Sequence, residues 1–370
     1  MELGRDPDRR KEAEGNLTAN RRPMHWVALL ALVAGLAAGS TTAAEPGKCT
    51  LVRIAEWAVR SPRGQPVVDG AINGQQIGVM LDTGAARSII LRSAADRLAL
   101  IRYNSRGSRM IGVGGESAVE TVSIDEFALG SEVRRNWRML VAGEHEFGPD
   151  IAVILGEDFL SRTDVEFDLA HDAVRLFQAR DCEGKDLAYW TTEGAGVVGF
   201  DASYGAGSAI ELAVEVNGRP LRAQLDSGAS SSVLTKSQAA SIGVTPESKG
   251  VVAAGCSGGL GQKAIEIWLG SFETFRIGDE LVRDPRIRFA DIWRFSTIKR
   301  SSLIASRPST LPDMLLGADF LRAHRVLVAH SQRKMYFTYA GGTVFPPLRA
   351  KECNEPPRAP ADPTRAPASR

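Results

Sequence analysis

The chain has 370 residues, of which 44% are hydrophobic and 24% are charged. This length exceeds that of one typical domain, and the composition is that of an ordinary globular protein, so we expect two domains with additional segments. Lys and Arg number 45 against 44 Asp and Glu, which gives a formal net charge of +1. That balance argues against nucleic-acid binding and against a polybasic membrane surface, because both need clustered positive charge.

An apolar segment near the N-terminus predicts export. Residues 26–38 are apolar throughout but fall short of the roughly 20 residues that a membrane-spanning helix needs. Arg21 and Arg22 precede this segment, and small residues follow it. We therefore expect residues 1–44 to be a secretory signal, cleaved near Ala44, and the mature protein to be periplasmic or extracellular. The alternative is that residues 26–38 stay in place as an anchor to the inner membrane.

The segment after this signal is expected to lead into the first domain. Residues 45–65 form this lead-in, part of which is alternatively a short prosegment, and translation starts at either Met1 or Met24. The chain has four cysteines, which allow three pairings. Cys49 and Cys182 flank the first half of the chain, so we favour a disulfide between them, as an exported protein can form.

The chain contains one internal duplication, which is the strongest pattern in it. The sequence INGQQIGVMLDTGAARSII begins at residue 72, and VNGRPLRAQLDSGASSSVL begins at residue 216. Asp82 and Asp226 hold the same place in the two copies, nine positions after the Asn of an Asn-Gly pair. A second repeated block reads ILGEDFL in the first copy and LLGADFL in the second, where extra residues precede it.

The duplication sets the domain boundaries that we expect. Residues 66–179 form the first lobe and residues 208–340 the second. Residues 180–207 contain several glycines and few long apolar runs, so we expect a linker there. Residues 341–370 form a tail rich in Pro, Ala and Arg, which is expected to stay disordered because it has little apolar surface to bury.

Both lobes are predicted to be mostly β. The Asn-Gly pairs indicate hairpin turns, and strands should end directly before Asp82 and Asp226. Residues 93–100 and 237–242 are expected to form short helices, each capped by its first Ser. Residues 163–177 should form another hairpin, and a second short helix is expected after the glycine of each ILG or LLG block.

Two aspartates from facing loops are the groups that acid–base hydrolysis of an amide needs. Two carboxyl groups a few ångströms apart cannot both ionise easily, so the pair shares one proton. The charged member can then deprotonate a water while the protonated member donates to the substrate carbonyl. The neighbours fit this chemistry, because a glycine allows close backbone approach and a hydroxyl can bond across to the opposite loop. These neighbours are Thr83 and Gly84 in the first copy and Ser227 and Gly228 in the second.

The two halves resemble the retropepsin-like and pepsin-like aspartic peptidases, in particular the bacterial retropepsin-like type in tandem. The resemblance covers residues 66–177 and 208–339. It implies an all-β fold of two homologous β-barrel lobes related by a pseudo-twofold axis, with a cleft between them. It also implies that Asp82 and Asp226 are the catalytic dyad, that Thr83 and Ser227 bond the two lobes together, and that no metal or organic cofactor takes part.

The resemblance extends to the flaps and to the ILG and LLG blocks. The blocks match strands that pass beneath the active-site loops, and Asp158 and Asp319 follow them. The first copy has Phe167-Asp168-Leu169 after its block, whereas the second has Val328-Ala329-His330. Glycine-rich segments in both copies resemble flaps that close over substrate. The flap residues are Gly112, Val113, Gly114 and Gly115 in the first copy and Gly255 and Gly258 in the second.

The function implied by this resemblance is that of an aspartic endopeptidase acting on a peptide or protein substrate. One chain would supply both aspartates, so we expect a monomer. Two alternatives remain: a peptide-binding module with weak or no catalysis, and a structural module of the cell envelope on the same fold.

Other signals in the sequence are weaker. Residues 255–261 are glycine-rich but lack the Lys of a phosphate-binding loop, and a Cys256 nucleophile would need a positioned His and Asn. The five histidines form no HExxH pair and are expected at the surface or in turns. Asp164, Asp168 and Asp172 lack the glycine and the terminal glutamate of a calcium loop, so no metal site is expected.

Overall fold

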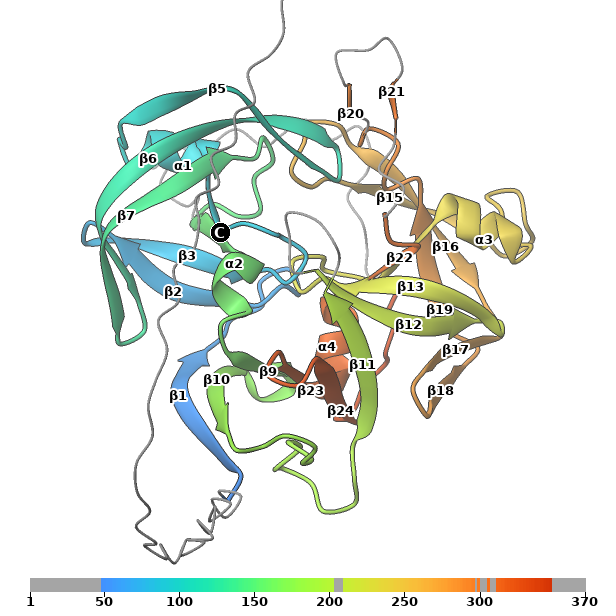
Figure 1. Cartoon of the computed structure of the whole chain (residues 1–370). Coiled ribbons are helices and arrows are strands. Elements are labelled where there is room, and N and C mark those ends of the chain that lie inside the picture. The colour runs from blue at the N-terminus through green and yellow to red at the C-terminus, as the bar shows by residue number, and fades with distance from the viewer. Residues whose placement is uncertain (1–47, 203–208, 297, 300–304, 307–310, 348–370) are drawn as a thin grey trace, which may run out of the picture. The chain divides into compact units, whose positions relative to one another are not determined.

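The computed structural model of the protein describes residues 48–202, 209–296, 298–299, 305–306 and 311–347 (Figure 1). The expected signal segment, residues 1–44, lies outside the described residues, as do the end of the expected linker and the tail from residue 348. Within the described ranges, no helix combines the length and the hydropathy that crossing a membrane requires.

The first half of the chain closes into a small β-barrel. Its elements are β2 (Val67–Ile72), β3 (Gln75–Leu81), β4 (Ile89–Leu91), α1 (Arg92–Arg97), β5 (Arg102–Gly112), β6 (Gly115–Leu129), β7 (Glu132–Ala142), β8 (Ile151–Leu155) and α2 (Glu157–Leu160). The strand order is β2-β3-β8-β4-β7-β6-β5, and β6 also pairs with β2, which closes the barrel. Every residue of β8 is buried, because this strand passes between β3 and β4 through the interior of the lobe.

The second half repeats this pairing pattern. Its elements are β12 (Ile210–Val216), β13 (Arg219–Leu225), β14 (Val233–Thr235), α3 (Lys236–Ser241), β15 (Val252–Ser257), β16 (Ile265–Ser271), β17 (Thr274–Ile277), β18 (Glu280–Arg283), β19 (Arg286–Ala290), β22 (Met314–Leu316) and α4 (Ala318–Ala323). The order is β12-β13-β22-β14-β19-β16-β15, and β17 pairs back with β12. The fold is therefore the predicted one, all-β with two homologous barrel lobes. The extra length of the second copy contains the small pair β20 (Ile298–Lys299) and β21 (Ala305–Ser306).

Six strands, three from each half, join the lobes in a continuous sheet. They are β1 (Thr50–Ala58), β9 (Asp164–Asp168), β10 (Ala173–Arg180), β11 (Gly196–Ala202), β23 (His324–Ala329) and β24 (Lys334–Tyr339). Their order is β1-β10-β9-β23-β24-β11, and β9 and β23 pair antiparallel at its centre (Figure 1). The short helix η1 (Leu169–His171) turns the β9–β10 hairpin at the predicted place. Thus β1 and β11, which lie in the expected lead-in and linker, are strands of the interlobe sheet.

The favoured disulfide is present. Cys49 and Cys182 are bonded, with their Cα atoms 4.4 Å apart and 133 positions between them in the chain. The bond fixes the start of β1 to the segment that follows β10. Since β1 already pairs with β10 along its length, the N-terminal edge of the sheet is held both by backbone hydrogen bonds and by a covalent link.

The Asn-Gly turns form as predicted, and the asparagines have a second role. Asn73 and Asn217 have φ values of 49° and 50°, a left-handed conformation that Asn tolerates better than most residues. The side-chain oxygen of Asn73 accepts hydrogen bonds from the backbone N–H groups of Asp125 and Glu126, each at 3.0 Å. Asn217 makes the equivalent pair of bonds at the start of β17. Each turn is thereby attached to the strand that closes its barrel.

The predicted Ser caps of the two longer helices are wrong. Helix α1 begins one residue earlier than expected, and its N-cap residue Leu91 has no capping side chain. Helix α3 begins after Thr235, whose hydroxyl accepts from the N–H of Gln238 at 3.4 Å. The chain passes directly from a strand into each helix, so the last, extended strand residue takes the cap position. Ser93 and Ser237 consequently lie inside the first helical turn.

Candidate active site

The structure brings Asp82 and Asp226 together. Strands β3 and β13 end one residue before them, and the loops that they begin face each other. The two half-buried carboxyl groups are hydrogen-bonded to each other. A Cβ atom added to Gly84 would lie 2.4 Å from the carboxyl carbon of Asp226, and one added to Gly228 would lie 2.3 Å from that of Asp82. Each carboxyl group therefore rests against the glycine of the opposite loop.

The residues after the aspartates bond the two loops to each other. The Thr83 hydroxyl donates to the Leu225 carbonyl at 2.8 Å and accepts from the Ser227 N–H at 3.0 Å. The Ser227 hydroxyl donates to the Leu81 carbonyl at 2.7 Å and accepts from the Thr83 N–H at 3.0 Å. Both side chains are fully buried, so these bonds are shielded from water. This reciprocal set fixes the distance between the loops and hence between the aspartates.

Backbone N–H groups of the loops orient each carboxyl group. Asp82 Oδ1 accepts from the N–H groups of Gly84 at 2.8 Å and Ala85 at 3.1 Å. Asp226 Oδ1 accepts from the N–H of Ala229 at 2.9 Å. In both loops it is Oδ1 that accepts these bonds, so the two carboxyl groups are oriented in the same way.

A repeated scaffold supports both loops from below. Gly156 and Gly317 pass so close to the loops that an added Cβ would lie 2.5 Å from a backbone atom of Ala85 or Ser231. The aspartates of the repeated blocks cap the same loops. Asp158 accepts from the backbone N–H and the hydroxyl of Ser88 at 2.7 and 2.6 Å, and Asp319 accepts from the same groups of Ser232 at 2.8 and 2.7 Å.

The electrostatics of the pair favour one shared proton. Burial raises the pKa of both carboxyl groups. The negative charge of Asp82 raises the pKa of Asp226 further, to well above its ordinary value, whereas the N–H of Gly84 offsets part of the rise for Asp82. Asp82 therefore loses its proton first, and Asp226 keeps the other as the pH rises.

The tip of the first flap docks on the second lobe. The flap is the β5–β6 hairpin, in which Gly112 ends one strand, Gly115 begins the other, and Val113 and Gly114 form the turn. The carbonyl of Val113 accepts from the N–H of Gly261 at 3.0 Å, and the carbonyl of Gly114 accepts from the N–H of Lys263 at 3.1 Å. The side chain of Val113 packs against an apolar cluster of the second lobe, formed by Val233, Ile265, Ile267, Ala290, Ile292 and Leu315.

The second flap is the β15–β16 hairpin, which contains both predicted glycines. Gly255 lies within β15, at an irregularity in its pairing with β16 and with a φ of 84°. Gly258 follows the end of β15, and an added Cβ there would lie 2.8 Å from Nδ1 of His145. The contact with the first flap is made further along, by residues 259–263. Gly255 thus lies in the first strand of this hairpin, and Gly258 begins the loop that forms its tip.

Two aspartyl protease family models match the chain in tandem. Residues 68–162 match the model described as "gag-polyprotein putative aspartyl protease", and residues 212–320 match the model described as "Aspartyl protease". The two matched ranges contain Asp82 and Asp226, respectively. The chain belongs to the retropepsin-like aspartyl protease family.

A solved structure similar to this two-lobed family member is that of a retropepsin-like aspartic protease from Rickettsia conorii. The two sequences are 18% identical, and the match covers 36% of this chain and 96% of that one, with a TM-score of 0.25. A search of curated proteins finds no match.

In this retropepsin-like chain, the second lobe also contributes a contact that sequence reasoning missed. The hydroxyl of Ser296 donates to the carbonyl of Gly112 at 2.9 Å, and Phe295 lies 3.5 Å from where a Cβ on Gly115 would be. Both residues belong to the loop that follows β19, which is longer than the equivalent loop after β7. The two loops differ in length and sequence, so the duplication gave no signal for this contact.

The expectation that the histidines lie at the surface or in turns is wrong for His324 and holds for His330, which lies in the turn between β23 and β24 although it is largely buried. His324 is fully buried, where its Nε2 lies 2.9 Å from a carboxylate oxygen of Glu280 and its ring stacks on Phe320. The side chain of His330 is 11% exposed and faces Glu157 of the first lobe. Residue type alone gave no sign of this, since both sites depend on partners that are distant in sequence.

The weaker readings find no support at the described residues. Cys256 is disulfide-bonded, so it has no thiol that could act as a nucleophile. Asp164 bonds to Ser331 at 2.7 Å and Asp168 bonds to Arg175 at 2.9 Å, each within the interlobe sheet. Among the residues that the structure describes, no cluster of three or more His, Cys, Asp or Glu side chains is arranged to hold a metal ion.

Proposed function

We propose that this protein is an aspartic endopeptidase that hydrolyses peptide bonds with a water molecule activated by Asp82 and Asp226. The observation that carries the proposal is the meeting of two carboxyl groups, one from each copy of the duplication, in a hydrogen-bonded pair that the opposite loops hold in place. Membership of an aspartyl protease family supports the same conclusion.

The electrostatics assign separate tasks to the two groups. Asp82, which ionises first, accepts a proton from the water as the water oxygen attacks the substrate carbonyl carbon. Asp226, which keeps its proton, donates it to the carbonyl oxygen, and a tetrahedral diol forms. When the diol collapses, the C–N bond breaks, the leaving nitrogen takes up the proton that Asp82 received, and a diol hydroxyl returns a proton to Asp226. The dyad is thus regenerated without any cofactor.

The flaps suit an extended peptide or protein substrate. Strand edges of the two hairpins can pair with a peptide backbone, which gives affinity without demanding one side chain. Because the two tips are hydrogen-bonded to each other and Val113 packs on the second lobe, the flap has to open before a peptide enters. A single chain supplies both aspartates, so we propose that the enzyme acts as a monomer.

We propose that the enzyme acts outside the cytoplasm, in the periplasm or beyond it. The disulfide between Cys49 and Cys182 supports this location, because structural disulfides persist in oxidising compartments.

The test is cleavage of a peptide library by the purified protein between about pH 3 and pH 8, a range that spans the ordinary titration of a carboxylate pair. The Asp82→Asn and Asp226→Asn variants serve as controls of nearly equal shape. Each should lose about 10³-fold or more of kcat/KM while keeping the parent melting temperature or exceeding it. Undiminished cleavage by both variants would rule the dyad out. Peptide binding without turnover by the parent would instead favour a binding module.

A further inference from the structure

Glu157 is a buried carboxyl group that the dyad chemistry does not use. It follows Gly156 in the ILG block, and its backbone N–H donates to the carbonyl of Ala85 in the Asp82 loop at 2.8 Å. Its side chain is 0% exposed. Within the described part of the chain, neither of its carboxyl oxygens has a hydrogen-bond partner. A buried carboxyl group without partners is costly, so a role beyond packing is expected.

His330 of the second lobe faces this carboxyl group. Its Nε2 lies 3.7 Å from Oε2 of Glu157 and, among the described residues, has no hydrogen-bond partner either. The ring packs edge-on against Phe200, with 5.7 Å between the ring centroids. An acid and a base thus meet across the lobe interface, beside the loop that carries Asp82.

The other copy lacks both groups. By the spacing of the repeated blocks, Ala318 takes the place of Glu157, and Leu169 takes the place of His330. The helix α4 that contains Ala318 packs against η1, which contains Leu169, so the equivalent contact exists there in apolar form. The fold does not require the polar pair, since it forms the same junction without one.

The surroundings keep both groups neutral over a wide pH range. The titratable groups that face Glu157 are Asp82 on the dyad loop, Asp158 on α2 and His330. Burial, and then the charges of Asp82 and Asp158, raise the pKa of Glu157 to about 8. Burial lowers the pKa of His330 to about 4. The carboxyl group of Asp164 lies next to His330 and is hydrogen-bonded to its backbone. Between these values, a protonated acid faces an unprotonated imidazole.

We propose that Glu157, opposed by His330, is a positioning residue that extends cleavage to higher pH by helping the dyad to keep its shared proton. The proposal rests on the proposed peptidase function. Glu157 interacts with the charge of Asp82, and Asp82 shares a proton with Asp226. The last of the three protons is therefore removed against the charges of the other groups. When Glu157 ionises before Asp226, its charge holds the remaining proton on the dyad. Cleavage then persists at pH values at which an isolated pair would become doubly charged and inactive.

The experiment is the pH profile of kcat/KM for the parent and for Glu157→Gln. The alkaline limb of the variant should fall about one pH unit lower, which is the usual scale for loss of a like charge at close range. The acid limb should not move, because Glu157 is uncharged there. His330→Leu, which copies Leu169, removes the group that faces the ionised carboxylate and should shift the alkaline limb in the same direction. The double variant should shift it no further. An unmoved alkaline limb in Glu157→Gln would overturn the proposal.

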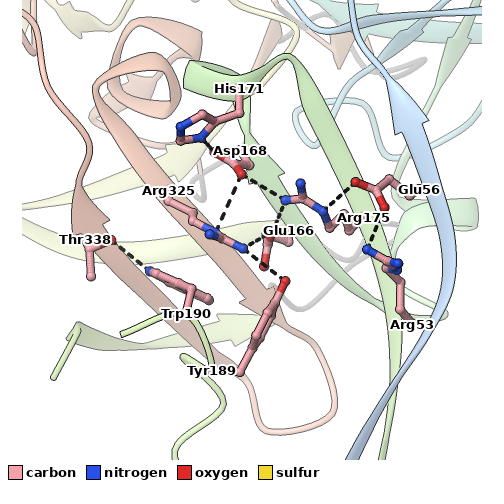
Figure 2. A network of polar contacts seen from close by, with 10 residues as sticks. All are labelled: Arg53, Glu56, Glu166, Asp168, His171, Arg175, Tyr189, Trp190, Arg325 and Thr338. Carbon is pink, nitrogen blue, oxygen red and sulfur yellow. Dashed lines mark hydrogen bonds and ion pairs between the residues drawn. The ribbon is translucent and has the colours of Figure 1, made fainter. Parts of the chain in front are cut away.

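A matched control separates charge coupling from damage to the fold. Glu166 is also fully buried between the lobes, but its partners are Arg175 and Arg325 (Figure 2). Glu166→Gln should lower the melting temperature without moving the alkaline limb. If it moves that limb as Glu157→Gln does, general destabilisation explains both variants and the proposal fails.

A second measurement does not depend on activity. In the NMR spectrum of the Asp226→Asn protein with ¹³C-labelled glutamate, one carboxyl signal should titrate near pH 8. That signal should be absent from the protein that also carries Glu157→Gln. It should titrate at lower pH when Asp82 is replaced by Asn, since that charge contributes to the rise. A Glu157 signal that titrates near its ordinary value, about 4.3, refutes the coupling. If the parent cleaves no peptide but this signal behaves as expected, the proposed function fails and the coupling stands.

Discussion

At the scale of single residues, the three positions Asp-Thr/Ser-Gly have separate physical roles. The Asp supplies the carboxyl group, and the Thr or Ser hydroxyl joins the two loops through buried hydrogen bonds. The Gly leaves room for the carboxyl group of the other lobe. Because each role depends on the opposite loop, a change at one position acts on the geometry of both aspartates.

The clearest test of this interdependence is Gly84→Ala. The new Cβ would lie 2.4 Å from the carboxyl carbon of Asp226, so the loops must separate. Misplacement of reacting groups by about 1 Å costs on the order of 10²-fold in rate, and an overpacked site loses about 1–3 kcal/mol of stability. The readouts are kcat/KM and the free energy of unfolding in urea. Gly199→Ala is the matched control, because an added Cβ there meets no atom within 4 Å. Equal effects of the two changes would contradict the argument.

Residues of the site could be predicted from sequence where their signal is local and repeated. Asp82 and Asp226 stand in matched triplets, so the duplication alone paired them. Glu157, His330 and Ser296 have no such signal. The first two differ from their counterparts Ala318 and Leu169, and Ser296 lies in the loop after β19, which differs in length from the equivalent loop after β7. Their importance depends on contacts between the lobes, which no pattern along the chain encodes.

At the scale of elements, the two flaps have become different from each other. In the first lobe the hairpin formed by β5 and β6 reaches over the interface, and its tip contacts the second lobe. In the second lobe the equivalent strand is divided into β16 and β17, and the segment near Ser296 supports the tip of the first flap. A duplicated scaffold thus carries one flap that docks and one that receives it.

Ser296→Ala should loosen the docked flap. The change removes the hydrogen bond from the Ser296 hydroxyl to the carbonyl of Gly112. A neutral hydrogen bond contributes about 0.5–1.5 kcal/mol, so opening should become roughly 2- to 12-fold more frequent. The measurement is hydrogen exchange at the amides of Gly261 and Lys263, which donate to the tip of the first flap. Ser93→Ala, in α1, is the control change of the same size. Unchanged exchange at both amides would show that Ser296 does not hold the flap.

Strands and helices, like the residues of the site, could be predicted only where their signal in the sequence is local. The Asn-Gly hairpins and the strands that end at the aspartates follow from local turn chemistry, and the structure contains them. Strands β1 and β11 were expected to be lead-in and linker, because their pairing with β10 and β24 joins segments far apart in sequence. Both helix caps were misplaced by two residues because the preceding strand fixes where each helix can start.

At the scale of the whole molecule, a charged network lies in the sheet that joins the lobes (Figure 2). Glu166 accepts hydrogen bonds from Arg175 at 2.6 Å and from Arg325 at 3.0 Å, so it connects a first-lobe strand to a second-lobe strand. Asp168 accepts from Arg175 at 2.9 Å. Arg325 also lies over the rings of Tyr189 and Trp190, which belong to the segment between the lobes. Because two acids and two arginines are interleaved, the buried charges compensate one another.

This network predicts how the stability of the protein depends on acid. Burial alone would raise the pKa of Asp168, but hydrogen bonds from Arg175 and His171, together with nearby positive charge, lower it overall. A carboxylate whose pKa is lowered on folding stabilises the protein fully above its unfolded pKa of about 3.9. That contribution disappears as the pH falls through the lower pKa of the folded state. The lobes should therefore stay joined through the mildly acidic range in which an aspartate dyad works.

Asp168→Asn tests this role. The amide cannot pair with Arg175 as a carboxylate does, so the variant should lose about 1.5–3 kcal/mol of unfolding free energy at about pH 6. Below about pH 4 the difference from the parent should begin to shrink, because Asp168 takes up a proton there in the unfolded parent and does so in the folded parent only at its lower folded-state pKa. Urea denaturation at several pH values measures both effects. Asp69→Asn is the control, since the Asp69 side chain is 77% exposed and its ion pair with Arg60 should contribute less than about 1 kcal/mol. A difference between Asp168→Asn and the parent that stays constant down to about pH 3 would contradict the prediction, because it would mean that the ionisation of Asp168 does not bind the lobes together.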